Sequence, residues 1–463
     1  MTPTPGTAAT PHRRTGELAF AAALIRTTNE LVMNLPSLFL RLPGSLILAV
    51  MMLTTTTGQA APGTEALDRQ VAALGEKYSI VGLSAAAVRD GTVVWETYQG
   101  RADVTRGVPV TPETKFRIAS ISKVFTATAL MQLWEAGNRP GAPAPSSPTG
   151  DSGGGRREPS RSVVGFDLDD DVSDTLGFKL RNPHHPDVPI TFRQLLTHTA
   201  SFADGAPYDD FLMFTYDHPN EAPAMSELLC EGGGFYRDGA VFSEHAPGTH
   251  YAYSNLGFGL LGTLVERLSG ERFDHYCTRT IFQPLDLSCR FNPAELGVAH
   301  PLAVLYSSSG GQWEPRCDDY HGAAPPERLK DGYRTGWNAL PCAPQGGLRA
   351  SARDLARFSR VFTDPAFARK HHILRASTVT LMQSTKPLTL HRSEKLVPGE
   401  LWIGHTGSAY GLLSLMFWEE SGPLTVIVLT NGSKPGAEDG GWTPMERELV
   451  GTIVSGIRSM GSL

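Results

Sequence analysis

The sequence has no long run of Lys or Arg, no C-x-x-C pair and no H-E-x-x-H motif. The lack of a basic stripe, together with a net charge of −6, gives no indication of a nucleic-acid partner. The missing Cys and His patterns remove the usual signatures of a zinc site or a redox pair. No apolar run reaches the roughly 20 residues that a membrane-spanning helix needs. We therefore expect no metal, no cofactor and no stable membrane span.

The first 62 residues differ in composition from the rest of the chain. They contain an apolar run, residues 46–53, that follows Arg41 and ends before small residues near Ala60. A basic residue, a short apolar segment and small residues in this order are typical of a signal peptide. The leader has ordinary length if translation starts at Met33, so we expect a secreted or periplasmic protein. The alternative is a disordered tail with a short apolar patch.

The composition is that of a soluble globular enzyme, with 41% hydrophobic and 19% charged residues. We expect one domain over residues 63–463. Residues 138–165 are rich in Pro, Ser and Gly, which predicts a low-complexity insertion over the surface. The five cysteines allow two disulfides and one free thiol in an oxidising compartment, or five unpaired thiols.

Hydrophobic periodicity separates helices from strands along this domain. Two β-hairpins are predicted, one over residues 83–98 with Asp90-Gly91 at its turn, and one over residues 411–430. Strands near both ends, with helices between them, predict an α+β fold in which one sheet is assembled from both ends and a helical region is inserted. Apolar residues recur at helical spacing in residues 64–78, 120–136, 258–268, 351–362 and 445–457.

Ser120 and Lys123 are three residues apart in the first turn of the predicted helix 120–136. This spacing places both on one face, so the Lys amine reaches the Ser hydroxyl. No charged residue occurs from Val124 to Trp134, which indicates a buried helix. A buried Lys has a lowered pKa and acts as the base that a Ser nucleophile needs. The competing interpretation is a helix cap followed by a surface Lys.

Tyr253-Ser254-Asn255 is the only Y-x-N among the twelve tyrosines. On an extended segment, alternate residues point to the same side. We therefore expect Tyr253 and Asn255 to face one site, where the phenol handles protons and the amide orients the substrate and Lys123. The alternative is a turn at the start of a helix, capped by Asn255.

His405-Thr406-Gly407 is followed by Ser408 and a strand-like run. Polar side chains beside a Gly, at the start of an edge strand, suit a substrate backbone that lies along that edge. We expect His405, Thr406, Gly407 and Ser408 to bind substrate.

With these three motifs in this order, the sequence resembles the class C β-lactamase-like serine hydrolases. That group contains β-lactamases, D-alanyl-D-alanine carboxypeptidases, D-aminopeptidases and esterases. The resemblance extends from about Val81 to the C-terminus and includes residues 195–199, 253–257 and 346–355. It implies a β-lactamase/transpeptidase-like fold: an α/β sandwich with an antiparallel sheet flanked by helices, plus an all-helical region, and the site between them.

The same resemblance implies a role for each motif residue. Ser120 attacks a carbonyl and becomes acylated, while Lys123 and Tyr253 take its proton and pass it to the leaving group. Asn255 positions the substrate. The backbone amides of Ser120 and Ser408 form an oxyanion hole, which typically contributes about 3 to 4 kcal/mol per donor.

His405 departs from the class C β-lactamases, which usually have Lys at this position. A Lys offers a permanent cation to the carboxylate of a β-lactam, whereas His is mostly neutral at neutral pH. The expected activity is that of a D-Ala-D-Ala carboxypeptidase, a D-aminopeptidase or an esterase, acting on a small-molecule or peptide substrate, peptidoglycan-derived or a β-lactam. A class C-type β-lactamase is the alternative, and a non-catalytic penicillin-binding sensor is the second.

Two other residues compete for a catalytic role. Ser152 lies in a G-x-S-x-G pattern, which forms a nucleophile elbow only between a strand and a helix. It lies instead inside the low-complexity insertion, so we interpret the match as accidental. His198 is predicted to be a buried hydrogen-bonding residue, since a Ser/Lys/Tyr set needs no His base.

Overall fold

The computed structural model describes residues 64–138, 165–297, 301–330 and 332–460. The predicted leader, nearly all of the predicted insertion 138–165 and Ser152 lie outside the described residues, so the predictions made for them stay predictions. Within the described ranges, no helix has both the length and the apolar character that crossing a bilayer demands. All five cysteines are free thiols, which agrees with the second of the two cysteine alternatives.

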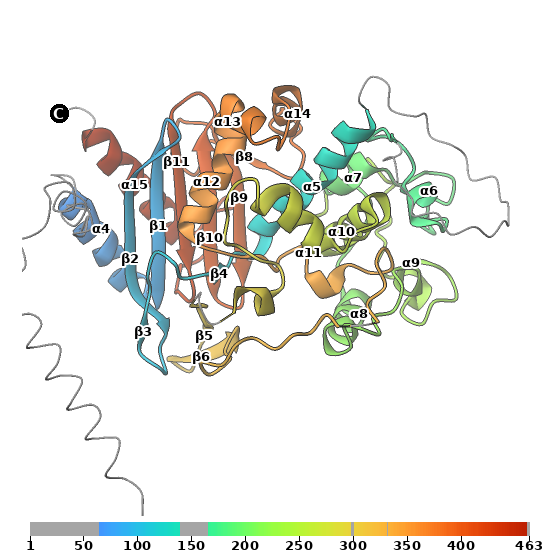
Figure 1. The fold of residues 1–463 in the computed structure, drawn as a ribbon, viewed down its shortest axis with the longest axis horizontal. Helices are drawn as coiled ribbons and strands as arrows, with labels where there is room; N and C mark the ends of the chain where they lie inside the picture. The colour runs from blue at the N-terminus through green and yellow to red at the C-terminus, as the bar shows by residue number, and fades with distance from the viewer. Residues whose placement is uncertain (1–63, 139–164, 298–300, 331, 461–463) are drawn as a thin grey trace, which may run out of the picture. The chain divides into compact units, whose positions relative to one another are not determined.

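A seven-stranded sheet forms one side of the domain, in the order β3-β2-β1-β11-β10-β9-β8 with every neighbouring pair antiparallel (Figure 1). The first and last strands of the chain meet inside it, because β1 pairs with β11 from Leu83↔Thr430 to Arg89↔Leu424. The predicted sheet built from both ends is therefore confirmed. Its strands are β1 (Gly82–Arg89), β2 (Thr92–Asp103), β3 (Val108–Pro109), β8 (His391–Ser393), β9 (Trp402–Ala409), β10 (Leu412–Glu419) and β11 (Leu424–Thr430).

Both predicted hairpins are present. β1 and β2 are joined by Asp90-Gly91, and both residues have positive φ, 50° and 73°. Two left-handed residues in a row give the tight turn whose twist matches that of the strands it joins. β10 and β11 form the second hairpin, closed by residues 420–423.

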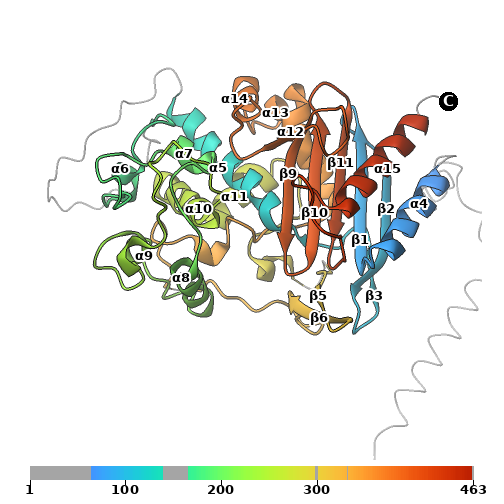
Figure 2. The same ribbon diagram turned by 180° about the vertical axis from the view of Figure 1, so that it is seen from behind.

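Helices cover both faces of the sheet. Figure 2 shows α4 and α15 side by side on one face, where Val71 and Ile453 share a core with Leu83 of β1. α12 covers the other face, where Phe358 shares a core with Ala86 of β1. β1 is thus buried on both sides, and all of its residues except Arg89 are buried. These helices are α4 (Thr64–Lys77), α12 (Ala352–Thr363) and α15 (Pro444–Met460).

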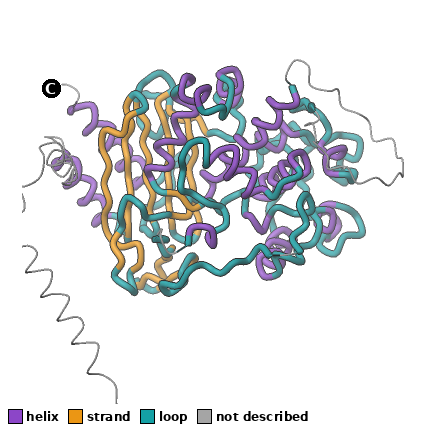
Figure 3. Tube along the Cα trace, in the orientation of Figure 1, coloured by secondary structure: helices purple, strands orange, loops and turns teal. Residues whose placement is uncertain are grey.

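The part of the domain beyond the sheet and its covering helices is mostly helical (Figure 3). Its centre is the packed pair α5 (Ser122–Gly137) and α10 (Asn255–Ser269). α5 is buried over almost its whole length, as the absence of charge from Val124 to Trp134 predicts. The shorter helices are α6 (Val172–Leu176), α7 (Phe192–Leu196), α8 (Ala206–Asp217), α9 (Ser226–Leu229), α11 (Phe273–Cys277), α13 (Pro365–Lys370) and α14 (Ala376–Met382).

Two short strand pairs connect the sheet with the helical part. β4 (Phe116–Arg117) pairs with β7 (Arg349–Ala350), which brings the segment before Ser120 next to the segment after Gln345. The second pair is β5 (Leu305–Ser309) with β6 (Gln312–Cys317). The β4–β7 pair therefore holds the segments that carry Ser120 and Gln345 next to each other.

Candidate active site

Ser120 lies in a 3₁₀ turn, Ala119–Ile121, between strand β4 and helix α5. Ala119 has a φ of 44°, a left-handed conformation that is uncommon for a residue with a Cβ. Such strain persists only where the surrounding structure imposes it. Here Gly407 of β9 lies so close that a Cβ on it would be 2.3 Å from the Ile118 carbonyl oxygen. The turn is held between the helix and the sheet, and Ser120 stays half-buried.

Lys123 lies one helical turn after Ser120 and is fully buried. Its Nζ is 3.0 Å from Ser120 Oγ, 2.8 Å from Asn255 Oδ1 and 2.6 Å from the Gln345 carbonyl oxygen. Burial lowers the pKa of Lys123 to about 7, and the negative charge of Asp204 opposes part of that fall. The predicted alternative, a surface Lys, is therefore wrong.

The three partners of Lys123 also orient its amine. The oxygens of Asn255 Oδ1 and of the Gln345 carbonyl only accept hydrogen bonds, so they occupy both N–H groups of a neutral amine. The lone pair that remains then faces the third partner, the Ser120 hydroxyl. A neutral Lys123 is thus placed to accept the Ser120 proton.

Tyr253 reaches this pair from the segment before α10. Its ring centre lies 4.9 Å from Lys123 Nζ. Burial raises the pKa of the Tyr253 phenol, and a hydrogen-bonding interaction with the Ser120 side chain partly offsets the rise. Tyr253 is 37% exposed, which makes it the most accessible of the three residues. The structure therefore brings Ser120, Lys123 and Tyr253 together.

The Tyr253-Ser254-Asn255 motif enters a helix through an extended residue, Ser254, with φ −135° and ψ 125°. Ser254 is the N-cap of α10, and its side chain accepts a hydrogen bond from the Gly257 N–H at 3.0 Å. Tyr253 stands before the cap and Asn255 is the first helical residue, yet both lie beside Lys123. The prediction that Tyr253 and Asn255 face one site across an extended residue is confirmed, although Asn255 is already helical. The alternative in which Asn255 is the cap is wrong, because Ser254 is the cap.

His198 supports this helix start from behind. Its Nδ1 accepts the Ser254 N–H at 3.0 Å, and its ring stacks on Tyr253 with centres 4.3 Å apart. Burial, with nearby Lys123 adding to it, lowers the pKa of His198 to about 3. The ring is therefore neutral, and the nitrogen that it uses as acceptor is already occupied. This fits the predicted buried hydrogen-bonding residue.

His405, Thr406, Gly407 and Ser408 lie in β9, beside the Ser120 turn. The register of β8 ends at Gly404 of β9, so the strand edge is open from His405 onward, as predicted. His405 is buried, and its Nδ1 contacts the Thr406 carbonyl oxygen, whereas Ser408 is exposed. His405 and Gly407 are thus buried, whereas Thr406 and Ser408, on the opposite face of the strand, are more exposed.

His391 of β8 joins the site although no sequence motif marks it. Its ring and that of His405 are 4.4 Å apart and meet edge to face. Burial lowers the pKa of both imidazoles, and the nearby Lys123 amine lowers them further. At neutral pH both rings are therefore uncharged.

Gln345 and Asp204 are the other site residues that sequence reasoning missed. Gln345 directly precedes residues 346–355, a segment of the family resemblance, and its backbone oxygen holds Lys123. Asp204 follows residues 195–199 and binds the start of α10. Neither belongs to a spacing motif, so only the fold shows that they face Lys123.

Gly407→Ala is expected to lower the free energy of unfolding by about 1 to 3 kcal/mol, because the added Cβ overpacks the contact with the Ile118 carbonyl. It is also expected to lower kcat, since the backbone that must give way carries Ser120. Thermal melting and steady-state kinetics measure both. Gly451→Ala is the control, since space around Gly451 in α15 is open and Ala favours the helix. Equal stability of both variants would contradict the packing described here.

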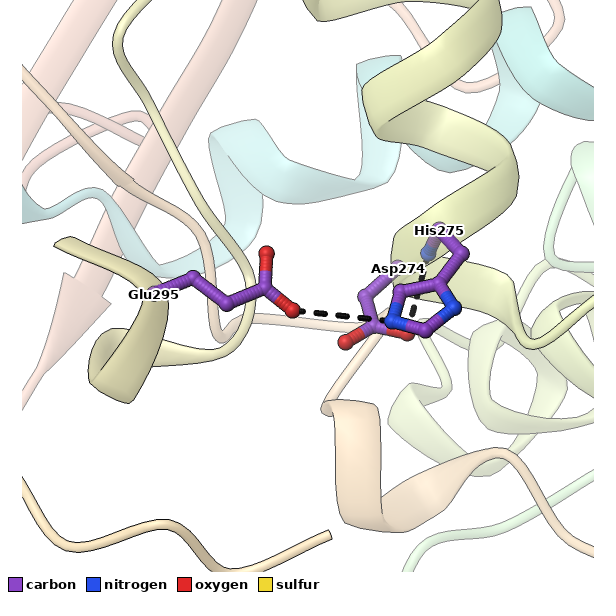
Figure 4. A group of neighbouring side chains, drawn as sticks. All are labelled: Asp274, His275 and Glu295. Atoms are coloured by element: carbon purple, nitrogen blue, oxygen red, sulfur yellow. Dashed lines mark hydrogen bonds and ion pairs between the residues drawn. The ribbon is translucent and has the colours of Figure 1, made fainter.

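One cluster has the composition of a metal site, Asp274, His275 and Glu295 (Figure 4). The guanidinium of Arg272 already occupies it, with 2.6 and 2.8 Å bonds to the two Asp274 oxygens. The same group lies 2.7 Å from His275 Nε2 and 3.4 Å from a Glu295 oxygen. Arg290 gives Glu295 a second cation at 3.7 Å. The acidic charge is balanced by arginine, so we interpret the cluster as an ion-pair network.

The sequence matches the family model described as Beta-lactamase over residues 67–450. The chain belongs to the Beta-lactamase family. Membership makes the protein a serine hydrolase, and the match covers the Ser120, Tyr253 and His405 motifs together.

Relatives of this family extend over most of the chain. Penicillin-binding protein 4 of Amycolatopsis lactamdurans is 25% identical over 405 residues, 83% of this chain and 89% of that protein. The octameric penicillin-binding protein homologue from Pyrococcus abyssi has a TM-score of 0.60 at 22% identity, over 85% of this chain and 77% of that one. D-amino acid amidase from Ochrobactrum anthropi SV3, complexed with D-phenylalanine, has a TM-score of 0.58 at 19% identity. The match covers 86% of this chain and 100% of that one. These likenesses confirm the predicted β-lactamase/transpeptidase-like fold.

Proposed function

We propose that the protein cleaves amide bonds of small peptide-like substrates through an acyl-enzyme on Ser120, as a D-Ala-D-Ala carboxypeptidase or D-aminopeptidase does, with esterase activity at the same site. The observation that carries the proposal is the geometry of Lys123. It is fully buried, its two N–H groups are taken by carbonyl oxygens, and its lone pair faces the Ser120 hydroxyl. That arrangement is a preformed base for one specific nucleophile.

Acylation follows from these positions. Lys123 takes the Ser120 proton while Oγ forms a bond to the substrate carbonyl carbon. Negative charge then develops on the carbonyl oxygen, for which the backbone amides of Ser120 and Ser408 are the proposed donors. The proton passes from Lys123 through the Tyr253 hydroxyl to the leaving nitrogen, the C–N bond breaks, and an amine departs.

Deacylation uses the same groups in reverse. A water molecule gives its proton to Tyr253 and Lys123 and attacks the acyl carbon. The ester bond to Ser120 breaks, and Ser120 recovers a proton from the same pair. Tyr253 suits the exchange with water because it is the most exposed of the three residues. Its high pKa keeps the phenol protonated, so Tyr253 acts as a relay and Lys123 as the base.

Charge at the strand edge supports the proposed substrate class. His391 and His405 are neutral at neutral pH, so this edge offers no cation to a β-lactam carboxylate. A cavity of about 840 Å³ is lined by His391 and by His198, whose ring stacks on Tyr253. Leu388 and Leu390 give it an apolar part. Its lining also carries Asp169, Arg193, Lys386 and Arg392, so the cavity alone does not select the charge of a substrate. The preference for a peptide-like substrate rests on the neutral histidines of the strand edge and is in line with the amidase among the structural neighbours.

The test is a panel of D-Ala-D-Ala peptides, D-amino acid amides, p-nitrophenyl esters and nitrocefin, with the acyl adduct followed by intact mass. Turnover of a peptide or amide, with a transient adduct on the peptide that contains Ser120, supports the proposal. A lasting penicillin adduct without turnover of any substrate would make the protein a sensor. Faster turnover of nitrocefin than of peptides would make it a β-lactamase.

The pH dependence of kcat/KM is expected to show a rise through an apparent pKa near 7. Lys123 is charged below that pH and cannot accept the Ser120 proton, and it is neutral above it. The three site histidines have pKa values below their usual range, so their titration lies at lower pH. Steady-state kinetics from about pH 5 to pH 9 with an uncharged ester measures this rise, the acid limb of the profile. A rate independent of pH across this range would rule out Lys123 as the base.

Export is a separate proposal that rests on the leader. Residues 46–53 after Arg41 have the order of a signal peptide, with small residues near Ala60. N-terminal sequencing of the mature protein from an expressing bacterium tests it. A mature chain that starts shortly after Ala60 supports export, and a chain that keeps residues 46–53 contradicts it.

A further inference from the structure

A carboxylate outside every sequence motif lies next to the proposed catalytic group. Asp204, in the loop between α7 and α8, accepts the Ser254 hydroxyl at 2.8 Å through Oδ1. It accepts the Asn255 N–H at 2.6 Å through Oδ2 and the Leu256 N–H at 3.2 Å through Oδ1. One side chain thus binds three successive residues at the start of α10.

We infer that Asp204 is a positioning residue of this active site: it holds Tyr253 and Asn255 against the Ser120–Lys123 pair and supplies the one carboxylate charge that Lys123 faces. The inference rests on the proposed function of that pair. It goes beyond a structural cap, because the same carboxylate acts on both the geometry and the charge of the base.

The geometric part follows from what each bond fixes. Asn255 donates its backbone N–H to Asp204 and offers its side-chain oxygen to Lys123, so a movement of Asp204 is transmitted to the amine through one residue. Ser254 donates its hydroxyl to Asp204 and its backbone N–H to His198. The peptide that follows Tyr253 is therefore held from two sides.

The electrostatic part follows from the groups around Lys123. Ser120, Asn255 and the Gln345 carbonyl are uncharged partners. The rings of Tyr253 and Phe258 lie 4.9 and 5.6 Å from Nζ, and His198, His391 and His405 face the same amine as neutral groups. Asp204 is the charged group that acts on this amine, and its negative charge favours the protonated form.

These two parts separate in a mutant series. Asp204→Asn removes the charge and one of the two acceptor oxygens, Asp204→Ala removes the charge and both oxygens, and Asp204→Glu restores the charge on a longer side chain. Asp204→Asn is expected to move the acid limb of kcat/KM to lower pH by about one unit, because a protonated Lys123 loses its counter-charge. Asp204→Ala is expected to show the same displacement with a further fall of the plateau of at least tenfold. Asp204→Glu returns the limb towards the wild-type position. Asp210→Asn, which removes an exposed carboxylate of α8, is the control and leaves the position of the acid limb and the plateau of kcat/KM unchanged.

A second readout needs no substrate. The ¹³C signal of the Lys123 ε-carbon, assigned by its loss in Lys123→Arg, is titrated in the wild type and in Asp204→Asn. A lower midpoint in the variant supports the inference, and identical midpoints with an unmoved kinetic limb would reduce Asp204 to a helix cap. Failure of the proposed function would give a different result, namely turnover that does not depend on Ser120. The titration of the Lys123 ε-carbon signal would still test the effect of Asp204 in that case.

Discussion

Ser120→Ala is expected to lower kcat/KM by about 10⁴-fold to 10⁶-fold for every substrate that the wild type turns over. The variant lacks the only oxygen that Lys123 is oriented to deprotonate, so no acyl-enzyme forms. The residual rate would come from substrate binding and the oxyanion hole alone. Steady-state kinetics and intact mass with a slow substrate measure the two effects.

The matched control is Ser152→Ala, which removes the serine of the competing G-x-S-x-G pattern. It is expected to keep the full rate, because that pattern lies in a low-complexity segment with no strand and helix around it in the sequence. An opposite result, with activity lost in Ser152→Ala and kept in Ser120→Ala, would overturn the whole assignment.

Lys123→Met is expected to lower kcat/KM by about 10³-fold to 10⁴-fold while the fold stays at least as stable as the wild type. The catalytic loss follows from removal of the base. The stability follows from linkage: the native site holds the Lys123 proton with a pKa near 7, whereas the unfolded chain binds it at an ordinary lysine value. Between these two values the unfolded state binds more protons, so the native state gains stability as pH rises, and Met removes that dependence. Chemical denaturation at pH 7 and pH 9 measures it.

A second buried lysine provides the contrast. Lys115 is as inaccessible as Lys123, but its Nζ is 2.5 Å from Asp354 Oδ2 and 2.5 Å from Ser288 Oγ. Lys115→Met leaves the Asp354 carboxylate buried without its cation and is expected to cost about 3 to 5 kcal/mol of stability. At a temperature where this variant is folded, kcat should stay within a few fold of the wild type. If Lys123→Met were the less stable variant and Lys115→Met the less active one, the roles assigned to the two lysines would be reversed.

Local physics explains which parts of the fold were predictable. The Asp90-Gly91 turn needs two residues that tolerate positive φ, and Ser351 followed by Asp354 forms a capping box, so both can be recognised within a few residues. α8 was not predicted, because Gly, Pro and Asp around it hide the helical spacing of its buried residues, Tyr208, Phe211 and Thr215. At Tyr253-Ser254-Asn255 the extended conformation was predictable, but the helix that starts at Asn255 was only the alternative, because the capping residue itself is extended.

Sequence by itself determined the Ser120–Lys123 pair, since a spacing of three across a 3₁₀ turn that continues into α5 brings the two side chains to one side. It also supplied the Tyr253, Asn255 and His405 motifs. Tertiary structure decided the hydrogen-bond partners and the pKa of Lys123. Its partners come from 132 residues away at Asn255 and 222 residues away at Gln345, and its charge is balanced against Asp204 from another loop. A pKa depends on desolvation and on nearby charges, and both are properties of the packed neighbourhood, which no local pattern in the chain specifies.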